Sequence, residues 1–255
     1  MSDYVEVIDN NNDNLSETNT GKFTGKVFGY MGIGLAITAI VSLILTFVFT
    51  RIFPIVGSDD LVNEEYFIVY VAIFAVSFIA LLITSIVIRV SSLFRGNKNV
   101  VAPFIVYAVL MGVMMAALTL VVPGYIMSIT LAITMVTFLA MFLIGYFAKS
   151  NLSTLAIVAS GLAIGAFLIV MMNLLIFWFF PVYATLSTWL ASGIIFIAMM
   201  LFTIVDIRKV KEIAASGMGN NNIALYCAFT LYVDFIYMFI RILRIVIILF
   251  GKSKR

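Results

Sequence analysis

The sequence has little charge and no histidine. Only 11% of its 255 residues are charged, whereas 64% are hydrophobic, and the mean hydropathy is +1.20. A typical soluble domain is roughly 45–50% apolar and about 25% charged. Because so few charged side chains are available to cover a water-exposed surface, the composition predicts a protein that folds in a lipid bilayer rather than as a soluble globule.

Further absences exclude classes of function. Without histidine the chain has no Ser-His dyad or triad and no H-E-x-x-H metal site. Cys227 is the single cysteine, which excludes an intrachain disulfide and a cysteine-rich zinc site. The net charge of +3 is too small, and too dispersed, for a nucleic-acid-binding face. Catalysis is therefore the least favoured class, and we expect neither an enzyme nor a bound cofactor.

Long runs without charge are what the sequence does contain. Residues 27–50, 66–88, 99–148 and 150–205 hold no Asp, Glu, Lys or Arg. A membrane span needs roughly 20 apolar residues, so each of the two longest runs must turn back once. Pro123-Gly124 and Pro181 are the places where a helix is most readily broken.

These runs predict an all-α, polytopic membrane protein with seven transmembrane helices. The expected spans lie near 27–50, 66–90, 102–122, 125–147, 153–177, 183–207 and 223–250. Together they form one transmembrane domain over 27–250. It is preceded by a polar, Asn-rich tail, 1–26, which we expect to be disordered. It is followed by a short basic C-terminal tail, 251–255.

Lysine and arginine indicate the orientation of the spans. With a cytoplasmic N-terminus, the outer loops between spans contain only Arg51, and the first of them is acidic. The basic residues then gather inside, as the positive-inside rule requires: Lys22, Lys26, Arg89, Arg95, Lys98, Lys149, Arg208, Lys209 and Lys211. The basic tail conflicts with this, because a seventh full span would place it outside. A re-entrant last segment would return it, so the side of the C-terminus stays open.

Ionisable residues at membrane depth are rare and usually functional. Asp234 lies within an apolar stretch of the last span, and Asp206 ends the sixth. If the sixth helix reaches about 214 and the seventh starts near 222, the two lie about 12 and 18 Å from the turn between them. Carboxylates that come within hydrogen-bond distance share a proton and titrate as a unit. Because the chain has no histidine, Asp206 and Asp234 would then be the candidate proton sensor near neutral pH.

Each charged residue also has a simpler structural interpretation. Asp206 would then be an interfacial carboxylate paired with Arg208 or Lys209, and Asp234 would pair with Arg241, seven residues on along the same face. Arg89 and Arg95 close the second span on the same cytoplasmic side. Either could neutralise a deprotonated aspartate, or both could be anchors that follow the positive-inside rule.

Four segments resemble the Bax inhibitor 1 family. The stretch 228–245, AFTLYVDFIYMFIRILRI, is similar to the family's last-helix signature, and VDIRKV at 205–210 is similar to its pattern at the end of helix six. FGYMGIGL at 28–35 and YAVLMG at 107–112 resemble the openings of helices one and three. The likeness runs from about residue 22 to 250. Three departures are a valine at 205 for the usual tyrosine, Tyr237 for the usual asparagine, and the additional Arg241.

The resemblance implies a seven-helix fold in which six helices surround the last one. It also implies a pH-dependent calcium leak, with Asp206 and Asp234 as the proton-sensing pair and Arg89 or Arg95 as their charge partner. The compact length is typical of the bacterial members, which lie in the plasma membrane. Calcium is then the permeant ion, which deprotonated Asp206 and Asp234 would contact transiently through their oxygens, and the bilayer is the principal partner.

A second function remains open beside the leak. The protein could be a non-conducting membrane interaction protein that regulates a membrane protease or a stress response. The aspartates would then only hold helices together, and a membrane-protein partner would be required. A proton-coupled transporter would need inverted repeats, and only the tetrapeptide GLAI recurs, at 34–37 and 161–164.

Overall fold

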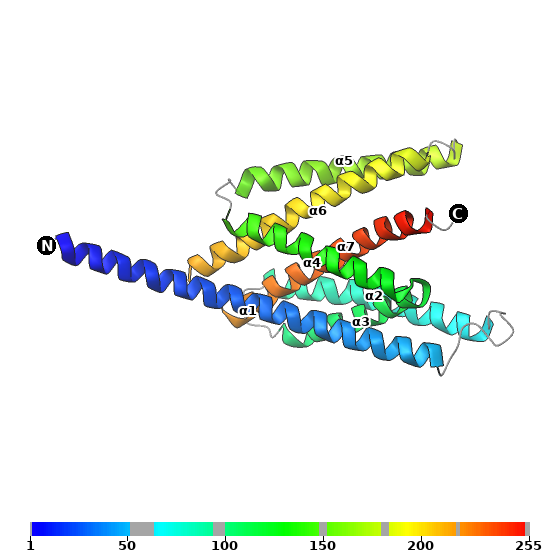
Figure 1. The fold of residues 1–255 in the computed structure, drawn as a ribbon, viewed down its shortest axis with the longest axis horizontal. Coiled ribbons are helices and arrows are strands. Elements are labelled where there is room, and N and C mark those ends of the chain that lie inside the picture. The colour runs from blue at the N-terminus through cyan, green and yellow to red at the C-terminus, as the bar shows by residue number, and fades with distance from the viewer. Residues whose placement is uncertain are drawn as a thin grey trace. The chain divides into compact units, whose positions relative to one another are not determined.

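The structure is a computed structural model that describes residues 2–51, 64–93, 100–147, 152–179, 184–217 and 220–252. Within those residues it is all-helical, as expected (Figure 1). The helices are α1 (Ser2–Arg51), α2 (Glu64–Leu93), α3 (Val101–Val121), α4 (Gly124–Phe147), α5 (Leu152–Phe179), α6 (Ala184–Ala215) and α7 (Asn221–Lys252). The predicted spans therefore each fall on a helix of their own.

Five of these helices are long and apolar enough to cross a membrane, judged over the described residues by length and hydropathy. The qualifying segments are Thr20–Arg51, Ile68–Val90, Val101–Thr119, Gly124–Phe147 and Ser153–Met171. This confirms a multi-pass helical membrane protein. The sixth and seventh crossings, by α6 and α7, stay predictions. In α7 the apolar sequence is interrupted by Asp234, Arg241 and Arg244.

The N-terminal segment differs from our expectation. We predicted disorder over residues 1–26, but α1 is helical from Ser2 and only its part from Thr20 onward is apolar enough to span a membrane. Adding a residue to an existing helix gains one backbone hydrogen bond for each residue fixed, whereas starting a helix is costly. The apolar span supplies that start, and the residues before it extend the same helix.

Two of the turns follow directly from the local sequence. Proline breaks the chain at 123, as predicted, and the Pro123 carbonyl accepts hydrogen bonds from the amides of Ile126 and Met127, which open α4. After α6, Gly217 adopts a left-handed backbone (φ 69°) that favours glycine. Asn220 then caps α7, since its Oδ1 accepts a hydrogen bond from the Ile223 amide at 2.8 Å. The predicted break at Pro181 lies outside the described residues.

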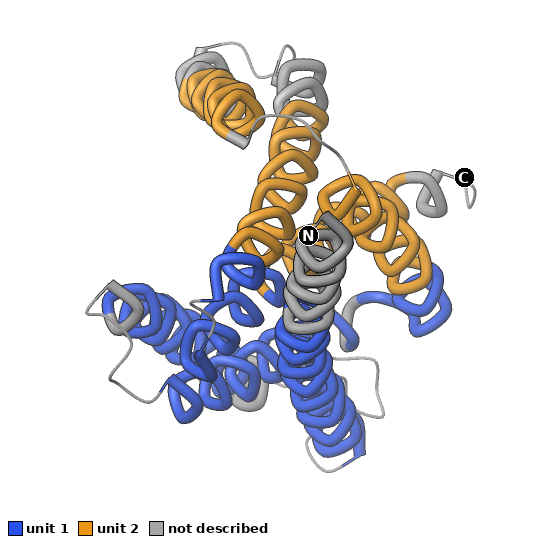
Figure 2. The backbone as a smooth tube through the Cα atoms, turned by 90° about the vertical axis from the view of Figure 1, so that its left-hand side faces the viewer, with its two compact units in different colours: residues 1–129, 213–232 blue, residues 130–212, 233–255 orange. Residues whose placement is uncertain are grey.

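The chain divides into two compact units, coloured separately in Figure 2. Unit 1 comprises residues 1–129 and 213–232, and unit 2 comprises 130–212 and 233–255. α7 contributes its first half to unit 1 and its second half to unit 2. Both halves are buried on most sides, from Ala224 to Val246. The arrangement of six helices around the last one stays a prediction.

In unit 1, α3 packs against both α1 and α2. α2 presents one buried stripe, which is formed by Tyr70, Ser77, Leu81 and Ile88. These positions recur at the four- and seven-residue spacing of one helix face. The remaining faces of α2 carry exposed Val, Ile, Leu and Phe side chains, for which the lipid tails of a bilayer are the natural surroundings.

A close approach of α1 and α3 depends on Gly112. A Cβ atom at that position would lie 2.7 Å from the Cβ of Val41 and 2.9 Å from the backbone oxygen of Thr38. Small residues at such crossings allow helix backbones to come together. Further along the same pair of helices, the hydroxyls of Thr46 and Thr119 are hydrogen-bonded. The interface thus combines close backbone packing with polar contacts.

In unit 2, α4 packs closely on α6. A Cβ atom at Gly145 would lie 3.0 Å from the Ile204 carbonyl oxygen. Lys211 of α6 donates a hydrogen bond from Nζ to the carbonyl of Tyr146, at the end of α4, over 2.8 Å. Its ammonium also lies 4.6 Å from the centre of the Tyr146 ring. A lysine at a helix C-terminus satisfies a terminal carbonyl and interacts favourably with the helix dipole. Phe138 of α4 contacts Phe235 of α7.

Candidate functional site

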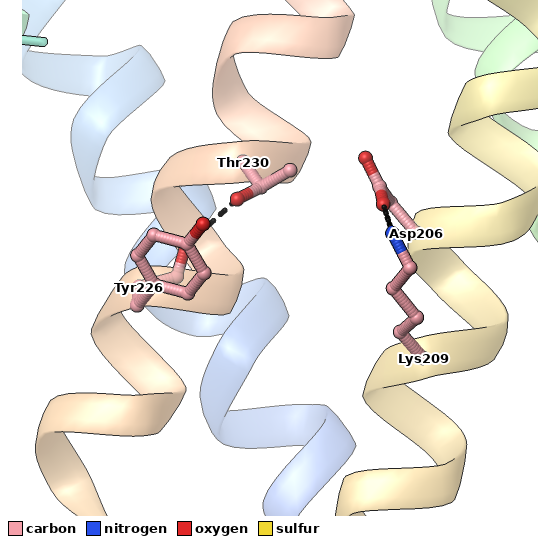
Figure 3. Close-up of polar contacts among 4 residues, drawn as sticks. All are labelled: Asp206, Lys209, Tyr226 and Thr230. Atoms are coloured by element: carbon pink, nitrogen blue, oxygen red, sulfur yellow. Dashed lines mark hydrogen bonds and ion pairs between the residues drawn. The ribbon is translucent and has the colours of Figure 1, made fainter. Parts of the chain in front are cut away.

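Asp206 lies on α6 and is paired with a lysine of its own helix. The Nζ atom of Lys209 is 2.9 Å from Oδ1 of Asp206 (Figure 3). The Asp206 side chain is 19% exposed and the Lys209 side chain 55%. The i,i+3 spacing places the two on neighbouring positions of one helix face. The simpler interpretation of Asp206, an interfacial carboxylate with a basic neighbour, is therefore present in the structure, and Lys209 is the neighbour.

Replacing Lys209 with glutamine should change the free energy of unfolding by less than about 1 kcal/mol. The ammonium is more than half exposed, and exposed ion pairs are screened by solvent and salt. Unfolding in detergent, followed by the loss of helical circular dichroism, would measure the change. A loss of several kcal/mol would show that the pair is a structural element rather than a solvated one.

Asp234 lies on α7, and its Oδ2 atom is buried. It belongs to unit 2 together with Asp206, so both candidate aspartates are in the same unit. Within that unit α6 and α7 are joined by a hydrogen bond from Nη1 of Arg241 to Oγ of Ser192, 3.2 Å long. The two carboxylates are therefore carried by helices that contact each other. The proton shared between them stays a prediction, as does the transient calcium contact.

Six polar residues of α7 fall on one stripe of the helix. Almost every other side of α7 is buried, but this stripe is half-buried or exposed along its whole length. Its members recur every three or four residues, the spacing of a single helix face: Tyr226, Thr230, Asp234, Tyr237, Arg241 and Arg244. We call these six residues the polar stripe. It places Asp234 in line with other hydrogen-bonding groups rather than alone among apolar ones.

The first part of the polar stripe is already hydrogen-bonded along the helix. The hydroxyl of Thr230, one turn before Asp234, donates to the Tyr226 carbonyl at 3.2 Å (Figure 3). This pattern is usual for threonine in membrane helices, where no water is available to the hydroxyl. The sequence had indicated only the pair formed by Asp234 and Arg241 on this face. The stripe could have been found by marking every polar residue of 223–250 on a helical wheel.

A buried hydroxyl cluster in unit 1 was not predicted as a site. Oγ1 of Thr38, on α1, lies 2.6 Å from the Tyr232 hydroxyl of α7, and donates to the carbonyls of Gly34 and Ala108 at 3.0 Å each. A threonine hydroxyl has a single proton, which the two carbonyls share, so the Tyr232 hydroxyl is the donor to Thr38. The cluster therefore links α1, α3 and α7 through hydrogen bonds. Its member on α7, Tyr232, lies two residues before Asp234.

The Tyr232 ring is contacted by two aromatic side chains. Tyr232 is completely buried, and the rings of Phe104 and Tyr107 meet it edge to face at 5.9 and 6.0 Å between centroids. A Cβ atom at Gly34 would lie 2.6 Å from the Phe104 ring and 3.2 Å from the Tyr232 ring. Glycine at 34 thus makes room for both rings. The sequence showed Gly34 and Thr38 only as small and polar residues in an apolar run.

The structure describes only one of the two candidate arginines. Arg89 is an exposed residue of α2, in unit 1, and Arg95 lies outside the described residues. Pairing of either with the aspartates stays a prediction. Over the part of the chain that the structure describes, no group of three or more Cys, Asp or Glu side chains gathers as a metal site would require.

The helices and their spans define a polytopic α-helical membrane protein. A family model described as "Inhibitor of apoptosis-promoting Bax1" matches residues 20–254, which is nearly the whole chain. The chain therefore belongs to the Bax inhibitor 1 family, as the resemblance of its last helix indicated. It is also 27% identical over 249 residues to a protein of Lactococcus lactis subsp. lactis (strain IL1403), "Uncharacterized protein YrjE", with 96% of each chain covered.

Proposed function

We propose that the protein is a pH-sensitive calcium leak whose conduction is controlled by protonation of Asp206 and Asp234. The observation that carries the proposal is the polar stripe of α7, which places Asp234 among hydroxyl and guanidinium groups along the one face of that helix that is not buried. Membership of the family supports the same function. Ionisable residues at membrane depth usually line an ion path or contact a partner.

The proposed mechanism follows from the charge of the two carboxylates. When deprotonated they attract Ca²⁺, a hard cation that prefers carboxylate, carbonyl and hydroxyl oxygens. When protonated they lose that attraction, and each gains a hydrogen-bond donor. A proton therefore binds one conformation of the helices more strongly than the other and shifts the equilibrium between closed and open states. Arg89 or Arg95 would stabilise the deprotonated pair.

Calcium flux into liposomes tests this mechanism. The full-length protein is reconstituted with a calcium-sensitive dye inside the vesicles, and initial flux is measured across mildly acidic to mildly alkaline pH. We expect wild-type flux to depend on pH, and Asp234→Asn to remove that dependence, because asparagine cannot exchange a proton. Asp206→Asn should have the same effect if the two aspartates act as a pair.

Glu212→Gln is the matched control. Glu212 is an exposed carboxylate of α6 whose Oε1 lies 3.9 Å from Nε of Arg208, so its replacement removes a charge of the same sign on the same helix. It should leave the pH dependence of flux unchanged. An Asp234→Asn protein that keeps the wild-type pH profile would contradict the proposal, provided that its helical content is unaltered.

The second candidate is a non-conducting interaction protein that regulates a membrane protease or a stress response. The ion pair between Asp206 and Lys209 favours it, because a carboxylate already neutralised by a neighbouring ammonium has less attraction for calcium. Wild-type liposomes without calcium flux, together with a membrane protein that co-purifies in stoichiometric amounts, would select this function. Flux in wild-type vesicles would exclude its non-conducting form.

We also propose the bacterial plasma membrane as the location, with a cytoplasmic N-terminus. The support is the concentration of lysine and arginine in alternate loops and the acidic first outer loop. In this orientation Asp206 and Lys209 lie at the cytoplasmic end of α6. Asp206, as one of the two proposed sensing carboxylates, would then be exposed to the pH of the cytoplasm.

A further inference from the structure

The second half of α7 carries two arginines on its accessible face. Arg241 and Arg244 are the last two members of the polar stripe, three residues apart, and their positive charges repel each other. Arg244 is exposed, and so are the apolar side chains around it, Ile240, Ile245 and Ile247. Two guanidinium groups therefore emerge through an apolar surface, where lipid is the expected neighbour.

The carboxylates of unit 2 cannot neutralise both arginines. Residues 130–212 and 233–255 contain Asp206, Glu212 and Asp234 as their complete set of Asp and Glu side chains. Asp206 is paired with Lys209, and Glu212 lies beside Arg208. Even if Asp234 compensates one guanidinium, the unit retains an excess of positive charge on this stretch of α7. An anion is the partner that would balance this excess charge.

The local geometry fits an oxyanion with several oxygens. A guanidinium has five N–H donors in a planar fork that matches a phosphate. Arg241 uses one of them on Oγ of Ser192, and a hydroxyl that accepts a hydrogen bond can also donate one. Two guanidinium groups and a hydroxyl thus stand within about one helical turn of each other, and the isoleucines beside Arg244 offer an apolar surface for acyl chains.

We propose that Arg241, Arg244 and Ser192 bind the phosphate group of an anionic phospholipid whose acyl chains lie on Ile240, Ile245 and Ile247. The net negative charge of such a lipid complements the excess positive charge of α7, whereas a zwitterionic lipid carries no net charge to offer. Basic residues near the membrane surface attract anionic lipids, and basic pockets between membrane helices bind their head groups. The site does not depend on calcium conduction.

Thermal unfolding of the full-length protein in a neutral detergent tests the site. The protein is mixed with short-chain phosphatidylglycerol, with short-chain phosphatidylcholine or with inorganic phosphate, all at one concentration. We expect phosphatidylglycerol to raise the unfolding midpoint more than phosphatidylcholine does. This excess should disappear in the Arg241→Gln/Arg244→Gln double variant and remain complete in Arg208→Gln, which removes a charge that already has a carboxylate beside it.

Three results would overturn the proposal. These are an equal effect of the two lipids on the wild type, an undiminished phosphatidylglycerol excess in the double variant, or an equal effect of inorganic phosphate, which would indicate a free-anion site. If the double variant does not fold, Arg244→Gln alone replaces it, because Arg244 is exposed. That variant should lose about half of the excess, since it removes one of two charges that attract the lipid additively. An unchanged excess would again refute the site.

Discussion

Replacing Tyr232 with alanine is expected to lower the free energy of unfolding by about 3–5 kcal/mol, the usual cost of removing a fully buried aromatic ring. The ring is completely buried and is contacted edge to face by Phe104 and Tyr107. Its removal leaves a cavity that Gly34 cannot fill, since that residue has no side chain. The measurement is equilibrium unfolding of the purified protein in mixed micelles, with increasing fractions of denaturing detergent.

Tyr232→Phe separates the hydroxyl from the ring. The ring contacts remain, and Thr38 keeps its hydrogen bonds to the Gly34 and Ala108 carbonyls, so no buried donor is left unsatisfied. We therefore expect a loss of only about 0.5–1.5 kcal/mol. A double-mutant cycle with Thr38→Val should give a coupling energy of about 0.6–1.7 kcal/mol, the range found for hydrogen bonds between membrane helices.

The cycle distinguishes the two roles of the tyrosine. No coupling between Tyr232→Phe and Thr38→Val would show that the 2.6 Å contact contributes nothing and that packing alone holds α7 against α1. An alanine variant as stable as the phenylalanine variant would contradict the cavity argument. In both experiments calcium flux should be recorded as well, because Tyr232 lies two residues from Asp234.

Replacing Gly112 with valine should be the second most damaging change, at about 1–3 kcal/mol or more, the range for overpacked interiors. The obstruction begins at Cβ itself, which would lie 2.7 Å from Val41 Cβ and 2.9 Å from the Thr38 backbone oxygen. No choice of side-chain rotamer relieves a clash with backbone. α1 and α3 must therefore separate, and the hydrogen bonds of Thr38 and Thr46 across their interface would weaken.

Gly32→Ala is the matched control for this variant. Gly32 lies on α1, and a Cβ atom there meets nothing within 4 Å. Alanine is a better helix former than glycine by up to about 1 kcal/mol, so this change should be neutral or stabilising. Unfolding in mixed micelles measures both variants. Equal stabilities of Gly112→Val and Gly32→Ala would show that the helices do not approach as closely as the structure has them.

The sequence by itself determined the environment, the helices and the family. Charge-free runs require a bilayer, and their lengths with Pro123 predicted one helix for each span. The predicted ends of α2 to α5 and of α7 lie within a few residues of the observed ones, whereas α1 begins earlier and α6 ends later than predicted. The stretch around Asp234 indicated the family, which the match over residues 20–254 confirmed. Proline and charge act locally, so their consequences can be read from neighbouring residues. The helix at residues 2–19 was missed because its composition, taken alone, favours disorder.

Only the tertiary structure decided which faces of the helices meet. In a bilayer the outward face is as apolar as the inward one, so hydrophobic periodicity does not distinguish them. The buried stripe of α2, the Thr38–Tyr232 cluster and the choice of Lys209 over Arg208 as the partner of Asp206 all depend on the positions of side chains in space. What selects the inner face is the fit of small and polar groups to a partner helix, and that fit exists only once the partner is in place.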